Sequence, residues 1–171
     1  MNWIWRGRLA GLMLLAVSFV AANAGTDPTG RTPGPDDTAA RLDRASAEAR
    51  LSLPDFLALV INRRGIASEA AVKVAMPTPE GGTEEIWITP FGIRDGDLVG
   101  LLATQPEHLH GRLRYDTVVF RRDQVRDWSY IGGDGRIYGS FAARALVADL
   151  GLPRNAAMRR LLSDSPLPVT R

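Results

Sequence analysis

The chain has no cysteine, a single lysine and two histidines among its 171 residues. The lack of cysteine excludes disulfides and a cysteine-linked lipid anchor. Every basic side chain other than Lys73 and the histidines is an arginine, so chemistry that needs a lysine at another position is excluded as well. The domain must therefore be held by a packed core, which a segment of roughly 130 residues can build without cross-links.

No group of residues identifies a reaction. His108 and His110 fall in one expected loop with Glu107, but no third ligand stands at helical or hairpin spacing. An exposed polar loop is therefore favoured over a weak metal site. The glycine-rich turn at 132–135 links two expected strands and does not open onto a helix N-terminus, as a phosphate-binding loop does. We predict neither a metal nor a cofactor.

The first 24 residues have the pattern of a secretory signal. Arg6 and Arg8 precede an apolar run of 14 residues at 9–22, and a small-x-small pattern ends at Ala24. The run is shorter than the ~20 residues of a membrane-spanning helix, which makes a retained anchor the weaker alternative. We expect cleavage before Gly25, a periplasmic or secreted protein, and no membrane contact after cleavage.

Loss of this signal would remove two of the 21 basic residues and leave 19 against 19 acidic ones. A formally neutral chain with scattered arginine pairs does not indicate a nucleic-acid partner. Residues 25–37 are rich in Pro, Gly, Thr and Asp and predict a disordered linker. A single domain is expected over 38–165, followed by a frayed tail at 166–171.

Two helices are expected at the start of the domain. Residues 38–50 are rich in alanine and follow two aspartates that can cap a helix. A second helix is expected to begin at Ser52, with Pro54 in its first turn and Asp55 completing a capping box, and to end at Gly65. Its apolar residues share one face, which predicts packing on the sheet and leaves a partner helix as the alternative: Leu53, Phe56, Leu57, Val60 and Ile61.

The period then changes to that of strands, expected at 71–76, 84–91, 98–104, 117–120, 125–131 and 136–138. Asp95-Gly96 predicts a tight hairpin. The almost unbroken apolar run at 98–104 predicts a central strand, with Gly100 at a close approach. Ser140 is expected to cap a helix at 141–150, and a short helix follows at 155–162. The fold class is α+β: a bent antiparallel sheet of about five to six strands, packed by an N-terminal helix pair and a C-terminal helix.

The stretch 117–131 is expected to organise the fold, because its two apolar runs meet at a charged corner beside Trp128. A buried tryptophan removes about 150–250 Å² of surface from water. Two interpretations are open for Asp127: a carboxylate that accepts backbone N–H bonds or pairs with an arginine, and a catalytic acid or base. Arg144 falls in a helix's first turn, where the dipole disfavours a cation, so we predict a bidentate pair between Asp127 and Arg144.

Several motifs, in this order, resemble those of the DUF2314 (YegJ-like) family of small bacterial domains, over about residues 70–146: 86–88, 98–103, 116–120, 125–130, 135–139 and Arg144. The resemblance implies a domain without an assigned activity. This chain departs from the family pattern at Tyr115, where the family tends to have Gly, and at Ala142, where it tends to have Thr. Because the hydroxyl of that Thr is missing, the resemblance assigns no catalytic residue.

The sequence favours a non-catalytic periplasmic binding module, with a groove at the Trp128 corner formed by Asp127, Trp128, Tyr130 and Arg144. Its partner would be an envelope protein, a peptide or a small ligand, and no oligomeric state is predicted. One alternative is a hydrolase that uses Asp127 with Glu107, His108 or Tyr130. The other is an immunity-type or stress-related protein that binds one partner tightly.

Overall fold

The computed structural model describes residues 34–61, 66–67, 69–149 and 156–168. The predicted signal, most of the predicted linker, and Gly65 lie outside these ranges. Within them, no helix is long and apolar enough to cross a membrane.

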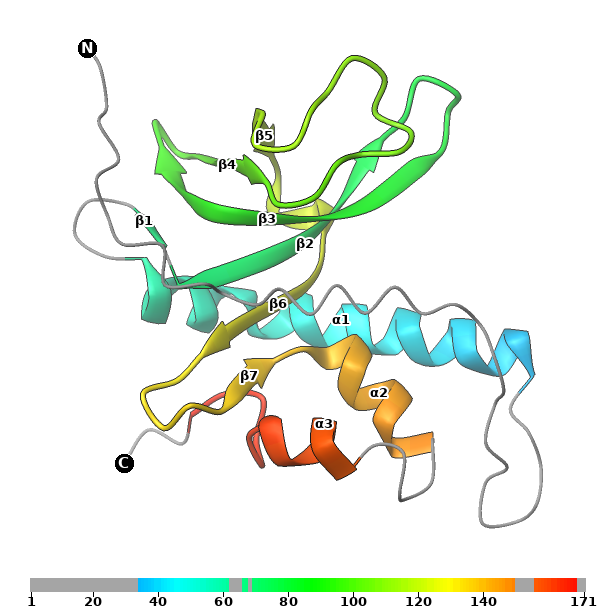
Figure 1. The fold of residues 1–171 in the computed structure, drawn as a ribbon, viewed down its shortest axis with the longest axis vertical. Coiled ribbons are helices and arrows are strands. Elements are labelled where there is room, and N and C mark those ends of the chain that lie inside the picture. The colour runs from blue at the N-terminus through cyan, green and yellow to red at the C-terminus, as the bar shows by residue number, and fades with distance from the viewer. Residues whose placement is uncertain (1–33, 62–65, 68, 150–155, 169–171) are drawn as a thin grey trace.

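The chain folds as an α+β domain, as predicted, with one long helix before the sheet and two short helices after it (Figure 1). The elements are α1 (Pro35–Val60), β1 (Ile66–Ala67), β2 (Ala70–Pro77), β3 (Thr83–Arg94), β4 (Asp97–Leu102), β5 (Thr117–Phe120), the 3-10 turn η1 (Arg122–Gln124), β6 (Val125–Ile131), β7 (Ile137–Gly139), α2 (Phe141–Asp149) and α3 (Ala156–Leu161). The strands are antiparallel in the order β5-β4-β3-β2-β6-β7, and the two-residue β1, which the sequence did not predict, pairs with β3.

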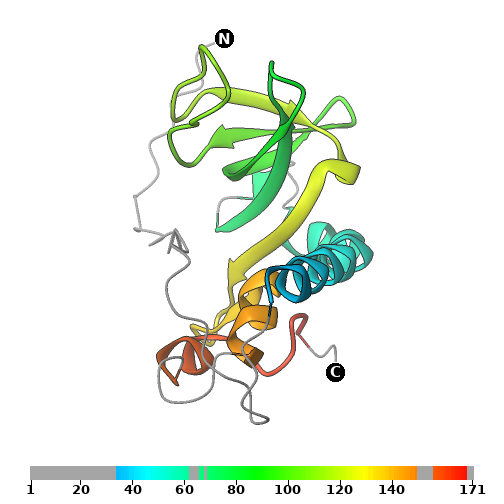
Figure 2. The same cartoon turned by 90° about the vertical axis from the view of Figure 1, so that its right-hand side faces the viewer.

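The sheet is strongly coiled. In the strand order β5 and β6 lie four spacings apart, about 19 Å in a flat sheet. The chain runs from Phe120 to Val125 through η1, and five residue steps span at most about 18 Å even when fully extended. The sheet must therefore curl until β6 approaches β5, and the upper strands wrap around a common interior in Figure 2. The predicted bend at 121–124 is confirmed as the corner that closes this curl.

The prediction of an N-terminal helix pair is wrong, because α1 runs without a break from Pro35 to Val60. The helix also includes residues 35–37, which were predicted to belong to the disordered linker. The predicted capping residue Ser52 lies inside the helix, where its hydroxyl donates to the carbonyl oxygens of Glu48 (2.9 Å) and Ala49 (3.1 Å). Pro54 is exposed within the helix, so its ring meets solvent and not the core. Tertiary packing holds together a helix that local signals would have divided in two.

The core lies between α1 and the sheet. The buried face of α1 consists of Ala45, Ala49, Leu53, Phe56 and Leu57, so the predicted apolar stripe does cover the sheet. Trp128 is fully buried, and its ring stacks on Phe56 with centroids 4.4 Å apart. Its indole Nε1 donates to the Ala49 carbonyl at 3.0 Å, which satisfies its polar atom inside the core. Trp128 therefore has the organising position that the sequence predicted.

Strand β4 is flanked by β3 and β5, so it is an interior strand, one place from the edge. The prediction for Gly100 is confirmed, because a methyl group there would collide with the side chains of Ile88 and Phe91. At the other end of the chain, residues 166–168 do not fray. The N–H of Gly139 donates to the carbonyl of Pro166 at 2.9 Å, and Leu167 packs against the core.

Candidate functional site

Asp127 is buried at the junction of β6 and α2, with 2% of its surface exposed. Its Oδ1 accepts the backbone N–H groups of Trp128 (2.8 Å) and Phe141 (3.0 Å), and its Oδ2 accepts that of Ala142 (3.1 Å). Because Phe141 and Ala142 are the first two residues of α2, Asp127 caps that helix from a strand. The interpretation of Asp127 as an acceptor of backbone N–H bonds is confirmed.

The carboxyl group of Asp127 is protonated more readily than that of an exposed aspartate. Burial raises the pKa of Asp127 to about 6, although the N–H donors of Ala142, Phe141 and Trp128 and the charge of Lys73 oppose this shift. A pKa in this range would suit proton transfer near neutrality. The carboxyl group is nevertheless enclosed by backbone and core, so a substrate in solvent does not reach it.

The predicted cap Ser140 does not cap α2. Its φ is 54°, in the left-handed region, whereas a capping residue needs an extended backbone. Its hydroxyl instead donates to the hydroxyl of Ser129 at 3.1 Å, and its N–H donates to the carbonyl of Trp128 at 2.8 Å. The strained turn at Ser140 delivers the first N–H groups of α2 to Asp127.

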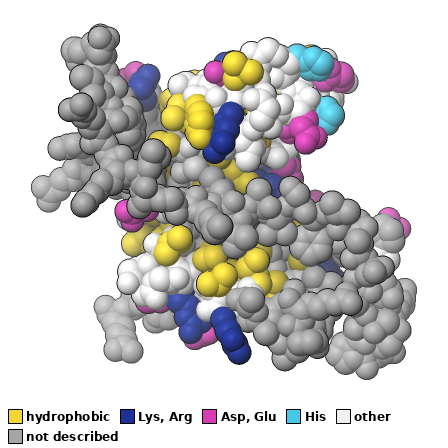
Figure 3. All heavy atoms as spheres, in the orientation of Figure 1, with side chains coloured by type: hydrophobic (Ala, Val, Ile, Leu, Met, Phe, Trp, Pro, Cys, Tyr) yellow, Lys and Arg dark blue, Asp and Glu magenta, His cyan; other side chains and the backbone are white. Residues whose placement is uncertain are grey.

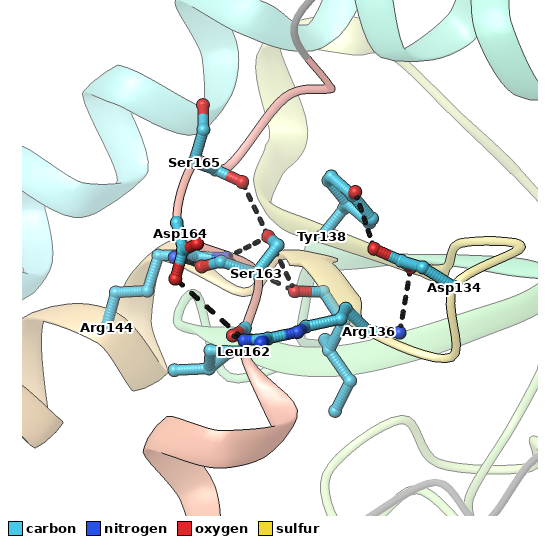
Figure 4. A network of polar contacts seen from close by, with 9 residues as sticks. Asp134, Arg136, Tyr138, Arg144, Leu162, Ser163, Asp164 and Ser165 are labelled. Atoms are coloured by element: carbon cyan, nitrogen blue, oxygen red, sulfur yellow. Dashed lines mark hydrogen bonds and ion pairs between the residues drawn. The ribbon is translucent and has the colours of Figure 1, made fainter.

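The predicted bidentate pair between Asp127 and Arg144 is wrong. The Arg144 guanidinium donates to the carbonyl of Gly139 (2.6 Å), to the carbonyl and hydroxyl of Ser163 (both 2.8 Å) and to the carbonyl of Ile137 (3.2 Å). Figure 4 shows it among these groups of β7 and the C-terminal segment. Burial lowers the pKa of Arg144, and the charge of Asp127 opposes this, so the two residues attract each other through space without a hydrogen bond.

Ser163, which the sequence did not single out, completes this network. Its hydroxyl also donates to the carbonyls of Ile137 (3.0 Å) and Ser165 (2.5 Å). Beside it, Arg136 donates to the carbonyl of Leu162 at 3.0 Å (Figure 4). These bonds attach residues 162–165 to β7. The sequence did not predict them because the two segments lie far apart along the chain.

Trp128 has no exposed surface, so this tryptophan does not line the groove that the sequence predicted. Tyr130 is half-buried between core and surface, and its ring stacks on Tyr138 at 5.1 Å. Burial raises the pKa of Tyr130 to about 12, and the neighbouring Tyr138 and Asp134 act in the same direction. Tyr130 is thus a neutral packing residue at pH 7, and the four predicted binding residues gather at one structural joint between β6, β7 and α2.

Of the three partners named for a hydrolase, Tyr130 lies with Asp127 on β6, whereas Glu107 and His108 belong to another part of the molecule. Glu107 and His108 lie in the loop between β4 and β5, at the opposite end of the molecule from α2 (Figure 1), and their N–H groups donate to the carboxylate of Glu84 at 2.9 Å. His110 contacts Glu80 at 2.8 Å, and both histidines lie at the surface (cyan in Figure 3). In the part of the chain that the structure describes, no three acidic or histidine residues are grouped as metal ligands.

A family model described as "Uncharacterized protein conserved in bacteria (DUF2314)" matches residues 39–158. The chain belongs to the DUF2314 family. Neither a curated protein nor a solved structure matches it. The match includes most of α1 and the whole sheet, so Asp127, Trp128, Tyr130 and Arg144 lie within this DUF2314 domain.

The departure of this DUF2314 chain at Tyr115 occurs where the backbone favours glycine. Tyr115 has φ 72°, and the N–H of Asp116 donates to the carbonyl of Leu113 at 3.1 Å, which together are features of a type II turn. Tyr115 also donates its N–H to Leu102, whose own N–H donates to Asp116, so Tyr115 is the first residue of a β-bulge of the kind that usually has glycine there. A large side chain is therefore held in a strained conformation.

This strained tyrosine is one of three exposed apolar side chains on β5 or in the turn before it, which the sequence did not predict. We define the β5 edge surface as Leu113, Tyr115 and Val119, whose exposed fractions are 64%, 60% and 61%. The turn is tied down by Gln105, which accepts the N–H of Arg114 (3.1 Å) and donates to the carbonyl of Arg112 (3.2 Å). One signal in the sequence could have indicated these exposed residues: Tyr115 stands where the family tends to have Gly, although its backbone conformation is unfavourable for a large side chain.

Proposed function

We propose that this DUF2314 chain is an exported, non-catalytic binding module that engages a partner protein or peptide through the β5 edge surface. The observation that carries the proposal is the contrast between its polar and apolar residues. The buried carboxylate of Asp127 and the half-buried guanidinium of Arg144 are engaged by backbone groups and, for Arg144, by the Ser163 hydroxyl. Large apolar side chains, in contrast, are exposed on a rigid turn and an edge strand.

The joint supports a structural role for the residues that the sequence offered as a site. Asp127 has all its bonds directed at the start of α2, and Trp128 is enclosed by α1. Catalysis by a carboxyl group needs a second polar group facing a common space. Glu107 and His108 lie elsewhere, and Tyr130 is a half-buried ring whose pKa burial raises to about 12, which favours binding over hydrolysis.

Photo-crosslinking in the native cell tests the binding function. A photoreactive phenylalanine at position 119 or 113 should form adducts with a distinct protein, whereas the same residue at position 51, exposed on α1, should not. Leu51 is 82% exposed, so the control is no less accessible. Equal adduct patterns from all three positions would contradict a binding surface at β5.

Export is tested separately. Cell fractionation should recover the protein from the periplasm or the medium, and sequencing of its N-terminus should begin at or near Gly25. An intact Met1 in the membrane fraction would refute the proposed cleavage.

A further inference from the structure

The outer edge of β5 has backbone groups that no described strand binds. β5 pairs only with β4 among the described strands. At the start of this ladder, Leu102 donates its N–H to Asp116. Hydrogen-bonded pairs alternate in an antiparallel ladder, so the next residue of β5 that bonds to β4 is Val118. The N–H and C=O groups of Thr117 and Val119 therefore point away from the sheet.

The chain segment that contains this edge has a net positive formal charge. Residues 112–123 include four arginines and two aspartates. Both aspartates are already engaged: Asp116 accepts the N–H of Leu113 at 2.9 Å, and Asp123 pairs with Arg121 at 3.1 Å. Arg112 and Arg122 are exposed and make no side-chain hydrogen bond or ion pair with any residue that the structure describes.

Charge decides which kind of strand fits this edge. A second copy of the chain, added antiparallel along β5, would bring two segments of net positive charge together, which is unfavourable. An acidic strand would meet uncompensated arginines at both ends of β5. Resting on the binding function proposed above, we propose that β5 accepts an extended, acidic peptide segment of a partner as an added antiparallel or parallel strand.

Tyr115 gives this edge an aromatic contact at its N-terminal end. The Arg114 guanidinium lies over the Tyr115 ring at 4.5 Å and its Nε donates to the carbonyl of Ala103 at 2.9 Å. The ring is thus held in place before a partner binds, which reduces the entropy lost on association. An added strand would gain backbone hydrogen bonds from Thr117 and Val119 and an apolar contact from the ring.

The direct test measures binding of two blocked octapeptides, one of alternating Glu and Val and one of alternating Lys and Val, by fluorescence anisotropy with the purified protein. The Glu peptide should bind at least about tenfold more tightly. Replacing Arg112 and Arg122 together by Gln should weaken it by about tenfold, whereas Arg160→Gln, at an exposed arginine of α3, should leave it unchanged. Equal binding of the two peptides would overturn the proposal.

Backbone recognition has its own readout. Val119→Pro removes an N–H that β4 does not use, so the fold should persist, as checked by circular dichroism, while peptide binding is lost. Val119→Thr keeps the N–H and serves as the matched control. In the unaltered protein, hydrogen exchange at Thr117 and Val119 should slow when the Glu peptide is added, while exchange at Val118 stays the same. Unchanged exchange at Thr117 and Val119 would overturn strand addition even if Val119→Pro did not fold.

Tyr115→Gly separates binding from folding. Glycine relieves the positive φ, so the melting temperature should rise, yet affinity for the Glu peptide should fall by about fivefold. A rise in both would refute the role of the ring. If crosslinking at position 119 captures a partner but the Glu peptide does not bind, strand addition is wrong and the binding function stands. If neither occurs, both are wrong.

Discussion

We expect the buried carboxyl group of Asp127 to contribute a stabilisation that falls as pH rises from 4 to 7. Its pKa is about 6 in the folded protein against 3.8 for an unperturbed aspartate. Between these values the unfolded chain has released the proton that the folded protein still holds, so the free energy of unfolding decreases with pH. The difference of about two pKa units corresponds to about 3 kcal/mol, present in full below pH 4 and lost above pH 6.

Asp127→Asn is the matched control, because its side chain does not titrate. Asn keeps Oδ1, which accepts the N–H groups of Trp128 and Phe141, and replaces Oδ2 by an NH2 group that faces the N–H of Ala142. The loss of that single bond should cost about 1 kcal/mol. Asp127→Ala removes all three acceptors and should cost about 2–4 kcal/mol, since two of the N–H groups are buried.

The assay is urea denaturation of the three proteins from pH 4 to pH 7.5, followed by tryptophan fluorescence. The difference in unfolding free energy between the native protein and Asp127→Asn cancels the other titrating groups. As pH rises, the native protein should lose stability relative to Asp127→Asn. A difference that is flat, or that shifts the other way, would falsify the raised pKa and show that the three N–H donors outweigh burial.

Three further predictions concern the same joint. Gly139→Ala should cost more than about 3 kcal/mol, because φ is +70° and a methyl group would meet the Trp128 ring, whereas Gly135→Ala, at φ +75° in open space, should cost about 1 kcal/mol. Trp128→Ala should cost about 3–5 kcal/mol in urea denaturation, and a loss below about 1 kcal/mol would contradict its central place in the core. Arg144→Lys cannot reproduce four guanidinium bonds and should cost about 1–3 kcal/mol, with faster hydrogen exchange at Ser163; unchanged exchange there would contradict the network.

The sheet was predictable because its signals are local. Alternation of apolar residues placed the long strands, and Asp95-Gly96 gave the hairpin, whose two residues have φ of 54° and 93°. The continuous helix α1 was not predictable, because Ser52 and Pro54 fit a helix start as well as an exposed helix interior. Only the packing of Ala49 and Leu53 on the sheet decides between them.

The candidate site was half predictable for a similar reason. The sequence identified Asp127 and Arg144 as residues that need partners and expected them to satisfy each other. The partners are backbone groups, N–H for Asp127 and C=O for Arg144, and a sequence pattern does not reveal which distant backbone groups meet a side chain. The glycine at 139 shows the same limit, since its close approach to Trp128 arises only when β7 pairs with β6.

Three of the motifs that this chain shares with DUF2314, residues 125–130, residues 135–139 and Arg144, meet in one place. Asp127 and Trp128, the hairpin ending at Gly139, and Arg144 together fasten α2 and the C-terminal segment to β6 and β7. The polar atoms of these motifs face inward and hold the joint together. They therefore do not determine which partner the protein binds. The differences that select a partner must then lie on surface that the joint leaves free. Tyr115 meets that condition: it departs from the family pattern, it is exposed, and the backbone conformation that it occupies would be better filled by glycine.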